Sequence, residues 1–192
     1  MDSPKFQIGN KEYASLIGQL PVREGAELYR RRNFSEIEEI TIHHSGSDGY
    51  CLNPVSLARE MVRHQDRRRT EYPEIPYHLV IEQDSKVTVC QPLDALTWHA
   101  DGGSPRDGVG RNNWWGVGIV LIGDFTHHPP SAAQLESLRE ACAEIDFAMG
   151  KRLLRVRHSD VQRTSCPGAT SRGPSNWFDL VFGDDRTSKI AR

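Results

Sequence analysis

Apolar and polar positions recur in short runs along the chain, and each run predicts one element of structure. Residues 38–44 are rich in Ile and Thr and predict a strand, as do residues 76–82 and, after a polar turn, residues 87–91. Residues 116–122 (GVGIVLI) are almost continuously apolar, which is typical of a central strand buried on both faces. Residues 153–157 predict a further short strand.

Two longer segments show helical periodicity. Asn53-Pro54 predicts a helix start, because Asn is a good N-cap and Pro fits the first turn; the apolar stripe that follows runs towards the basic residues 67–69. Ser131 with Gln134 predicts a capping box, and apolar residues at positions 135, 138, 142, 145 and 149 form one face of the helix up to Gly150. Shorter helices are expected over residues 11–20 and 176–182.

Strands alternating with helices indicate an α/β fold in a single domain, with a central mixed β-sheet flanked by helices. We expect an N-terminal arm over residues 1–36 that packs on the domain, the main domain over residues 37–183, and a C-terminal tail over residues 184–192.

Composition and charge narrow the choice of partners. The 192 residues include 24 Lys and Arg against 26 Asp and Glu, a net charge of −2, which gives no reason to expect nucleic acid or an anionic membrane as a partner. No apolar run approaches the length that spans a bilayer, and residues 1–10 lack the apolar core of a secretory signal. We therefore expect a monomer without a transmembrane segment, made in the cytoplasm without a signal peptide unless a leader has been removed.

The four cysteines are scattered, with no CxxC pair: Cys51, Cys90, Cys142 and Cys166. This pattern favours buried thiols and one cysteine with a special role over a disulfide framework, although a bridge such as Cys51–Cys90 stays open. Cys142 falls on the apolar face of a predicted helix and is expected to be a core thiol.

The special cysteine shares a short loop with a histidine. His158 and Cys166 lie eight positions apart before Pro167-Gly168, and His43 ends the first strand. Imidazole and thiolate are ligands that Zn²⁺ favours, and three protein ligands leave a fourth position for water, as in catalytic zinc sites. The pattern therefore predicts an open zinc site formed by His43, His158 and Cys166. Alternation along the strand turns His44 to the opposite face, where packing or support of the site is expected.

Several motifs in this order resemble the zinc-dependent N-acetylmuramoyl-L-alanine amidases of the type 2 amidase family, which includes the peptidoglycan recognition proteins. The matching segments are ITIHHS (40–45), PYHLVI (76–81), TWHA (97–100), NNWWGVGIVLIGDF (112–125) and RHSDVQRTSCPG (157–168). They extend over roughly residues 38–180. The N-terminal arm shows little resemblance, and Glu74-Ile75-Pro76 replaces the usual glycine-rich approach to Tyr77.

The resemblance implies a peptidoglycan hydrolase that cleaves the amide between N-acetylmuramic acid and the L-alanine of the stem peptide. It implies that zinc is held by His43, His158 and Cys166 and that Tyr77 assists catalysis. Thr164 stands where phage-type members carry Lys and many recognition proteins carry Thr, so only a hydroxyl is available there to support an oxyanion. The proton shuttle to the leaving amine stays open between Tyr77, solvent and His99.

Aromatic and amide side chains near the site suit the faces and hydroxyl groups of a glycan. We expect a substrate groove that is lined by His44, Trp98, His99, Asn112, Asn113 and Trp114, although a purely structural loop is an equal alternative for the last five. The pair His127-His128 before two prolines is expected in a solvated turn.

Three functions remain open at this point. The first is an amidase acting on the cell wall, for which the absence of a signal peptide favours a phage endolysin-like protein or a cytoplasmic recycling enzyme. The second is a peptidoglycan receptor without catalysis; such members of the family have typically lost the zinc-binding Cys, whereas Cys166 is present. The third is a cysteine hydrolase that uses Cys166 with His158.

Overall fold

A single mixed β-sheet organises the chain in the computed structural model, which describes residues 4–63, 72–100, 111–173 and 176–183. Within these residues the strands follow one another across the sheet in the order β1-β2-β5-β4-β6-β3-β7. Their bounds are β1 Lys5–Ile8, β2 Lys11–Ser15, β3 Glu39–His44, β4 Leu79–Ile81, β5 Val87–Val89, β6 Gly116–Leu121 and β7 Leu154–Arg157. The helices are α1 Pro54–Arg63, α2 Arg111–Trp115, α3 Ala132–Met149, α4 His158–Val161 and α5 Trp177–Phe182, with 3-10 turns at Phe34–Glu36 and Ala169–Ser171.

The strands β4, β6, β3 and β7 run parallel to one another and form the centre of the sheet. Strand β5 is antiparallel to β4 and parallel to β2, and β1 closes the far edge as an antiparallel hairpin with β2. The predicted α/β fold with a mixed sheet is confirmed.

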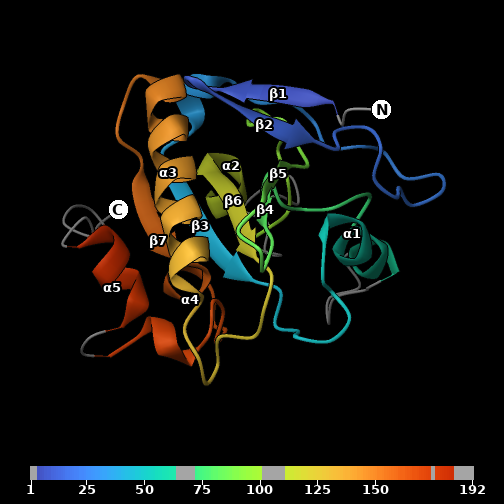
Figure 1. Cartoon of the computed structure of the whole chain (residues 1–192). Helices are drawn as coiled ribbons and strands as arrows, with labels where there is room; N and C mark the ends of the chain where they lie inside the picture. Colours follow the sequence, from blue (N-terminus) through green and yellow to red (C-terminus); the bar gives the residue numbers. More distant parts are fainter. Residues whose placement is uncertain (1–3, 64–71, 101–110, 174–175, 184–192) are drawn as a thin grey trace.

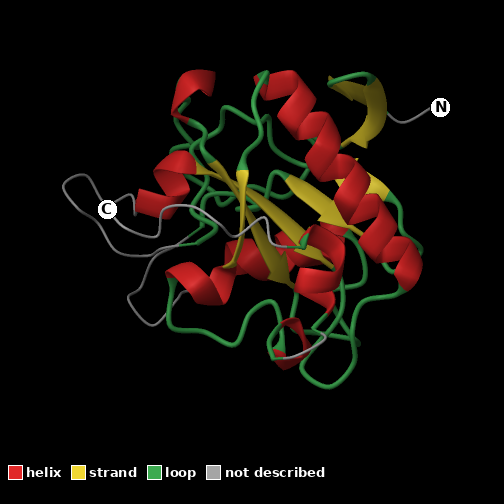
Figure 2. Ribbon diagram, turned by 90° about the vertical axis from the view of Figure 1, so that its left-hand side faces the viewer, coloured by secondary structure: helices red, strands yellow, loops and turns green. Residues whose placement is uncertain are grey.

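Alternation along the strands divides the core between the two faces of the sheet. Ile40 and Ile42 of β3 face the cluster that contains residues of α3 and α5, such as Leu138 and Phe178. Val80 and Val120 face the opposite cluster, which contains α1. Figure 1 shows α3 (orange) crossing in front of the sheet and α1 (teal) on the right; the turned view in Figure 2 shows the strands at the centre, surrounded by helices.

The predicted helix boundaries are confirmed where capping residues mark them. Ser131 accepts a hydrogen bond from the Gln134 amide, and the side chain of Gln134 accepts one from the Ser131 amide, as a capping box requires. At the other end of α3, Gly150 adopts the left-handed conformation (φ 63°) that commonly ends a helix. The Asn53 side chain caps α1 in the same way, by accepting from the Ser56 amide.

The helix predicted over residues 11–20 is wrong. Residues 11–15 form β2, with Tyr13 and Ser15 buried, and the hairpin turn before it uses Gly9 at φ 59°. Pairing with β1 and β5 on either side decides the conformation of this segment, which overrides a weak local preference. Two further strands are shorter than predicted: β4 begins only at Leu79, after Pro76, and β5 ends at Val89.

A short helix, α2, was not predicted. The basic residues 67–69, residues 101–110 and the tail over residues 184–192 lie outside the described residues. His127 and His128 are exposed in a turn, as predicted.

All four cysteines are free thiols, so the alternative of a Cys51–Cys90 bridge is not supported, and Cys142 lies in the core as predicted. In the part of the chain that the structure describes, none of the helices is both long enough and apolar enough to cross a bilayer.

Replacing Ser131 by Ala should lower the free energy of unfolding by about 1 kcal/mol, because the Gln134 amide loses its acceptor at the start of α3. Ser131→Asp keeps an acceptor at this position and should retain most of that stability. Denaturant titration of the three proteins measures both effects. Equal destabilisation of the two variants would show that the cap does not stabilise the helix.

Candidate metal centre

The two histidines of the predicted site are brought together by the register of β3 and β7. Ile42 lies opposite Arg157 in this parallel pair, so the residues that follow them lie side by side: His43, still within β3, and His158, the first residue of α4. Their ring centroids are 4.5 Å apart. Parallel strands end at the same edge of a sheet, so two residues that are 115 positions apart in sequence become neighbours.

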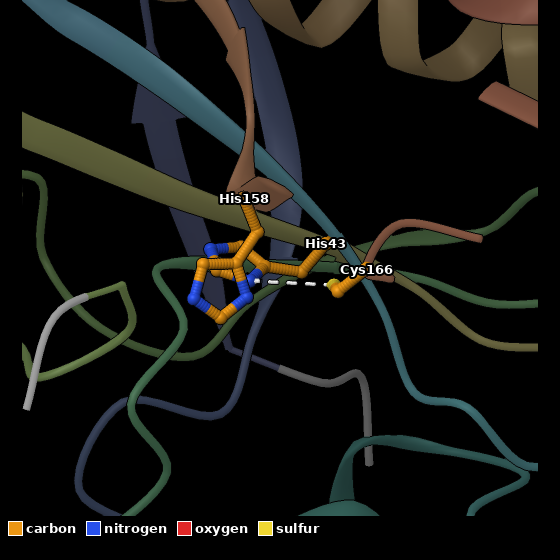
Figure 3. A group of neighbouring side chains, drawn as sticks. All are labelled: His43, His158 and Cys166. Atoms are coloured by element: carbon orange, nitrogen blue, oxygen red, sulfur yellow. Dashed lines mark hydrogen bonds between the residues drawn. The ribbon is translucent and has the colours of Figure 1, made fainter. Parts of the chain in front are cut away.

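The loop after α4 brings Cys166 to the same point. The Ser159 amide donates to the Cys166 carbonyl (2.8 Å) and closes the loop, and the His44 amide donates to the Cys166 sulfur (3.3 Å). Cys166 Sγ is then 3.8 Å from His43 Nδ1. Figure 3 shows the two rings and the thiol converging on one another. One ligand atom from each of His43, His158 and Cys166 lies within 4.8 Å of the other two.

Gly168 allows this loop to pack against the segment that follows β6. Its φ is 104°, a conformation that side chains with a Cβ rarely adopt, and a Cβ there would lie 2.2 Å from the Phe125 carbonyl oxygen. The backbone conformation and the close approach of Phe125 therefore require a glycine after Cys166-Pro167.

The donor set and its spacing fit zinc. Zn²⁺ binds imidazole nitrogen at about 2.0–2.1 Å and thiolate sulfur at about 2.3 Å, so a nitrogen and a sulfur ligand in a tetrahedral site lie about 3.6 Å apart. The separation of 3.8 Å between His43 Nδ1 and Cys166 Sγ is close to this value. With three protein ligands, the site could hold a metal ion and leave one position open.

A family model described as N-acetylmuramoyl-L-alanine amidase matches residues 33–169, which include the three residues of this cluster. The chain belongs to this amidase family.

Individual relatives agree with this assignment. Peptidoglycan-recognition protein 1 of Holotrichia diomphalia is 31% identical over 148 residues, which are 73% of this chain and 69% of that protein. The N-acetylmuramoyl-L-alanine amidase of Sus scrofa is 27% identical over 133 residues, which are 66% of this chain and only 21% of that protein.

Solved structures share the fold. The endolysin N-acetylmuramoyl-L-alanine amidase LysCS from Clostridium intestinale has a TM-score of 0.59 at 20% identity, covering 88% of this chain and 95% of that one. A Drosophila PGRP-LB mutant in complex with tracheal cytotoxin has a TM-score of 0.61 at 20% identity, covering 90% of this chain and 98% of that one.

Burial sets the protonation states of His43 and Cys166 in this candidate site. His43 is only 1% exposed, and burial, followed by the neighbouring His158, lowers its pKa well below the ordinary value, so the ring is neutral near pH 7. Burial raises the pKa of the Cys166 thiol to about 12, which the hydrogen bond from the His44 amide offsets only in part. Without a cation beside it, this thiol is therefore protonated at neutral pH.

Tyr77 and Thr164 both border the three ligands. The Tyr77 ring centroid is 5.1 Å from that of His43, and burial raises its pKa well above the ordinary value, so the hydroxyl keeps its proton. Thr164 lies two residues before Cys166, and its Oγ1 accepts a hydrogen bond from the Cys166 amide (3.2 Å). Tyr77 is thus a hydroxyl donor beside the site, whereas the Thr164 hydroxyl also orders the ligand loop.

His44 lies on the opposite face of β3, as alternation predicts. Its Nδ1 accepts from the Phe125 amide (3.2 Å), and its ring packs near that of Phe125. The structure places His44 where it supports the Cys166 loop through its own backbone amide.

The other residues that were expected to line a groove make internal contacts. Asn113 is 1% exposed and accepts from the Ala100 amide (2.7 Å), while Asn112 donates to Glu39. Trp114 Nε1 donates to Glu36, and Trp98 packs edge-on against Tyr29. These contacts favour a structural role for Asn112 and Asn113, in which they order the loop. Trp98 and Trp114 are partly exposed, and contact of these two residues with substrate stays a prediction.

His99 is buried next to the ligands. Its Nδ1 lies 3.1 Å from His43 Nε2, and its Nε2 lies 3.2 Å from the Gly116 carbonyl oxygen. Both ring nitrogens are engaged, which argues against His99 as the proton shuttle to a leaving amine.

Sequence reasoning missed the groups that hold the outer nitrogen of His158. His158 Nε2 lies 2.8 Å from the Ala100 carbonyl oxygen and 2.6 Å from Gln162 Oε1. Because the carbonyl oxygen only accepts, Nε2 carries the hydrogen and Nδ1 keeps its lone pair. Gln162 follows His158 by one helical turn, a spacing that the sequence displays; the Ala100 carbonyl carries no side-chain signal.

Cys166→Ser should lose most of the zinc affinity, because a hydroxyl is a much poorer zinc ligand than a thiolate. Zinc content after dialysis, measured by plasma mass spectrometry, tests this. Cys142→Ala is the matched control: it removes a buried thiol from the core cluster that contains Ile40 and Ile42 and should keep its zinc. A Cys166→Ser protein that retains one zinc per chain would contradict the ligand assignment.

Proposed function

We propose that this chain is a zinc-dependent N-acetylmuramoyl-L-alanine amidase that hydrolyses the amide between N-acetylmuramic acid and the L-alanine of the stem peptide in peptidoglycan. Its substrate would be cell-wall peptidoglycan or a muropeptide derived from it, and an endolysin-like action on the wall is part of the proposal. One observation carries it: a complete His43, His158 and Cys166 set converges at one edge of the sheet, in a chain of the amidase family.

Amide hydrolysis is slow because water is a weak nucleophile and the intermediate is anionic. Zinc held by these residues would lower the pKa of a water molecule, which makes it a better nucleophile, and would act as a Lewis acid that stabilises the negative charge. The chain's own residues supply the remaining requirements. His43 and His158 would hold the metal as neutral imidazoles, and Cys166 would hold it as a thiolate. Tyr77, a protonated hydroxyl beside His43, donates a hydrogen bond to the oxygen that becomes negative, a contribution of about 3 kcal/mol at typical oxyanion sites.

Thr164 supports the same reaction indirectly. Its hydroxyl accepts from the Cys166 amide and so fixes the loop that presents the thiolate. The same Oγ1 retains one hydrogen to donate, which is the basis for proposing that it also contacts the developing oxyanion.

A peptidoglycan receptor without catalysis is the second candidate. The relatives include proteins named for peptidoglycan recognition, and one solved neighbour is bound to tracheal cytotoxin. The presence of Cys166 within reach of both histidines favours the enzyme, because recognition of a muropeptide does not require a thiol and two imidazoles on a common point.

A cysteine hydrolase is disfavoured by the surroundings of Cys166. A nucleophilic cysteine needs a lowered pKa, whereas burial raises the pKa of this thiol. Its sulfur contacts the backbone amide and carbonyl of His44 and the neutral His43.

Digestion of purified peptidoglycan should release stem peptides that begin with L-alanine, and a chelator should abolish this release, which added zinc restores. Mass spectrometry of the soluble products identifies the cleaved bond. Stoichiometric zinc without any released peptide would favour the receptor. Release that survives chelation and stops on treatment with iodoacetamide would favour the cysteine hydrolase.

Tyr77→Phe should keep its zinc but lower turnover by about 10–1000-fold, because an oxyanion donor is lost while the ring remains. Turnover on a soluble muropeptide, together with zinc content, separates the two effects. Tyr72→Phe, which changes a neighbouring tyrosine in the same segment, serves as the control. Unchanged turnover in Tyr77→Phe would exclude this residue from the reaction.

A further inference from the structure

The ring of His43 is linked by hydrogen bonds to His99 and, through His99, to the Gly116 carbonyl. The carbonyl determines the donor and acceptor of each bond. His99 Nε2 faces the Gly116 carbonyl oxygen, which only accepts, so this nitrogen carries the hydrogen. A neutral imidazole carries one ring hydrogen, so with that hydrogen on Nε2 the Nδ1 of His99 is an acceptor. The Arg32 guanidinium, which donates to the same Gly116 carbonyl, disfavours a second positive charge on this ring. His43 Nε2 must then donate to His99 Nδ1 across 3.1 Å, which leaves the lone pair of His43 on Nδ1, the nitrogen next to Cys166.

Two glycines of β6 make room for the His99 ring. A Cβ at Gly118 would lie 2.7 Å from His99 Cγ. A Cβ at Gly116 would lie 3.0 Å from His99 Cε1 and Nε2, and 2.4 Å from the Asn112 carbonyl oxygen. Strand β6 is otherwise Val, Ile and Leu, which are favourable strand residues, and Gly weakens a strand. The two glycines therefore mark a place on the sheet that is shaped for an imidazole.

The far end of this chain of hydrogen bonds is fixed by Arg32. Its Nη2 donates to the Gly116 carbonyl oxygen (2.7 Å), the same oxygen that accepts from His99. Arg32 is 7% exposed, and its guanidinium also donates to three other backbone carbonyls, those of Leu93, Asn113 and Trp114. A buried cation is costly unless its donors are satisfied; here both Nη nitrogens have carbonyl partners, whereas Nε has none among the described residues. The bonds from Nη1 and Nη2 join the segments on either side of His99. Arg32 lies just outside the residues that the family model matches.

We propose that His99 is a positioning residue of the metal centre, which fixes the tautomer and the ring orientation of His43, and that Arg32 anchors it through the Gly116 carbonyl. This inference rests on the proposed zinc site. Residues that hold the outer nitrogen of a metal-binding His typically contribute 10–100-fold to metal affinity, because a free imidazole must otherwise be ordered when the metal binds.

Two substitutions of His99 separate this role from simple packing. His99→Asn places Oδ1 where Nδ1 was, so it keeps an acceptor for His43 but leaves part of the space empty. His99→Phe fills the space but cannot accept a hydrogen bond. Zinc affinity, measured by competition with a chromophoric chelator, should fall about 10–100-fold in His99→Phe and much less in His99→Asn.

Packing alone predicts the reverse order, and that order would overturn the proposal, as would equal affinities of both variants and the parent protein. Thermal unfolding of the zinc-free proteins provides the independent readout, because it should follow the lost volume and so rank His99→Asn below His99→Phe. The tautomer of His43, assigned by ¹H–¹⁵N correlation in zinc-free protein, should be the Nε2–H form in the parent and in His99→Asn.

The part played by Arg32 is tested by a double-mutant cycle. Arg32→Lys should lower zinc affinity in the parent but have little further effect in His99→Phe, where the connection to His43 is already broken. Losses that simply add would show that Arg32 does not act through His99. Arg31→Lys is the matched control, since this neighbouring arginine is exposed, pairs with Asp94 and should leave zinc affinity unchanged.

The proposed function and the role of His99 are refuted by different results. A parent protein that binds no zinc would refute the proposed function and with it the site. A parent protein that binds zinc and hydrolyses peptidoglycan, with affinities unchanged in His99→Phe, would refute only the role of His99.

Discussion

The parallel register of β3 against β7 is the constraint on which the site depends. Ile42 lies opposite Arg157, and this pairing places His43 beside His158 on the same side of the sheet. A slip by one residue would turn one of the two rings to the other face, since side chains alternate along a strand. The register is held because β3 is buried on both faces, with Ile40 and Ile42 on one side and Thr41 on the other. The core of the fold and the geometry of the candidate metal centre are thus set by the same interaction.

Two consecutive residues of the loop after β5, His99 and Ala100, fix the orientation of the two imidazole rings that the strands bring together. The His99 side chain engages the outer nitrogen of His43, and the Ala100 carbonyl engages that of His158. Both imidazoles therefore present Nδ1 to the position next to Cys166. The loop itself is held by Asn113, which accepts from the Ala100 amide, and by Arg32. The strands place the two rings, and this loop determines which nitrogen each ring offers.

The sequence predicted the parts of this arrangement that depend on residue type and local pattern. The strand over residues 116–121, the capped helix from Ser131 and the three ligand residues all carry strong signals of this kind. The β1-β2 hairpin was missed because its stability comes from pairing with β5, which no local pattern records. Arg32 was missed for a related reason: in the run Arg30-Arg31-Arg32 only the last is buried, and a sequence does not show which of three arginines points inward.

The buried polar groups behind the ligands bear on the choice between an enzyme and a receptor. A receptor needs a surface that recognises its ligand, and groups beneath that surface add little to recognition. This chain buries Arg32, His78, His99 and Asn113, each with hydrogen-bond partners, behind two imidazoles. Burial of polar groups is unfavourable unless they are hydrogen-bonded. A hydrogen-bonded buried network fixes one arrangement of its side chains. What the hydrogen bonds to His99 and Ala100 fix is the direction of two nitrogen lone pairs, which matters for binding a metal ion and has no evident value for a surface that only binds a glycan.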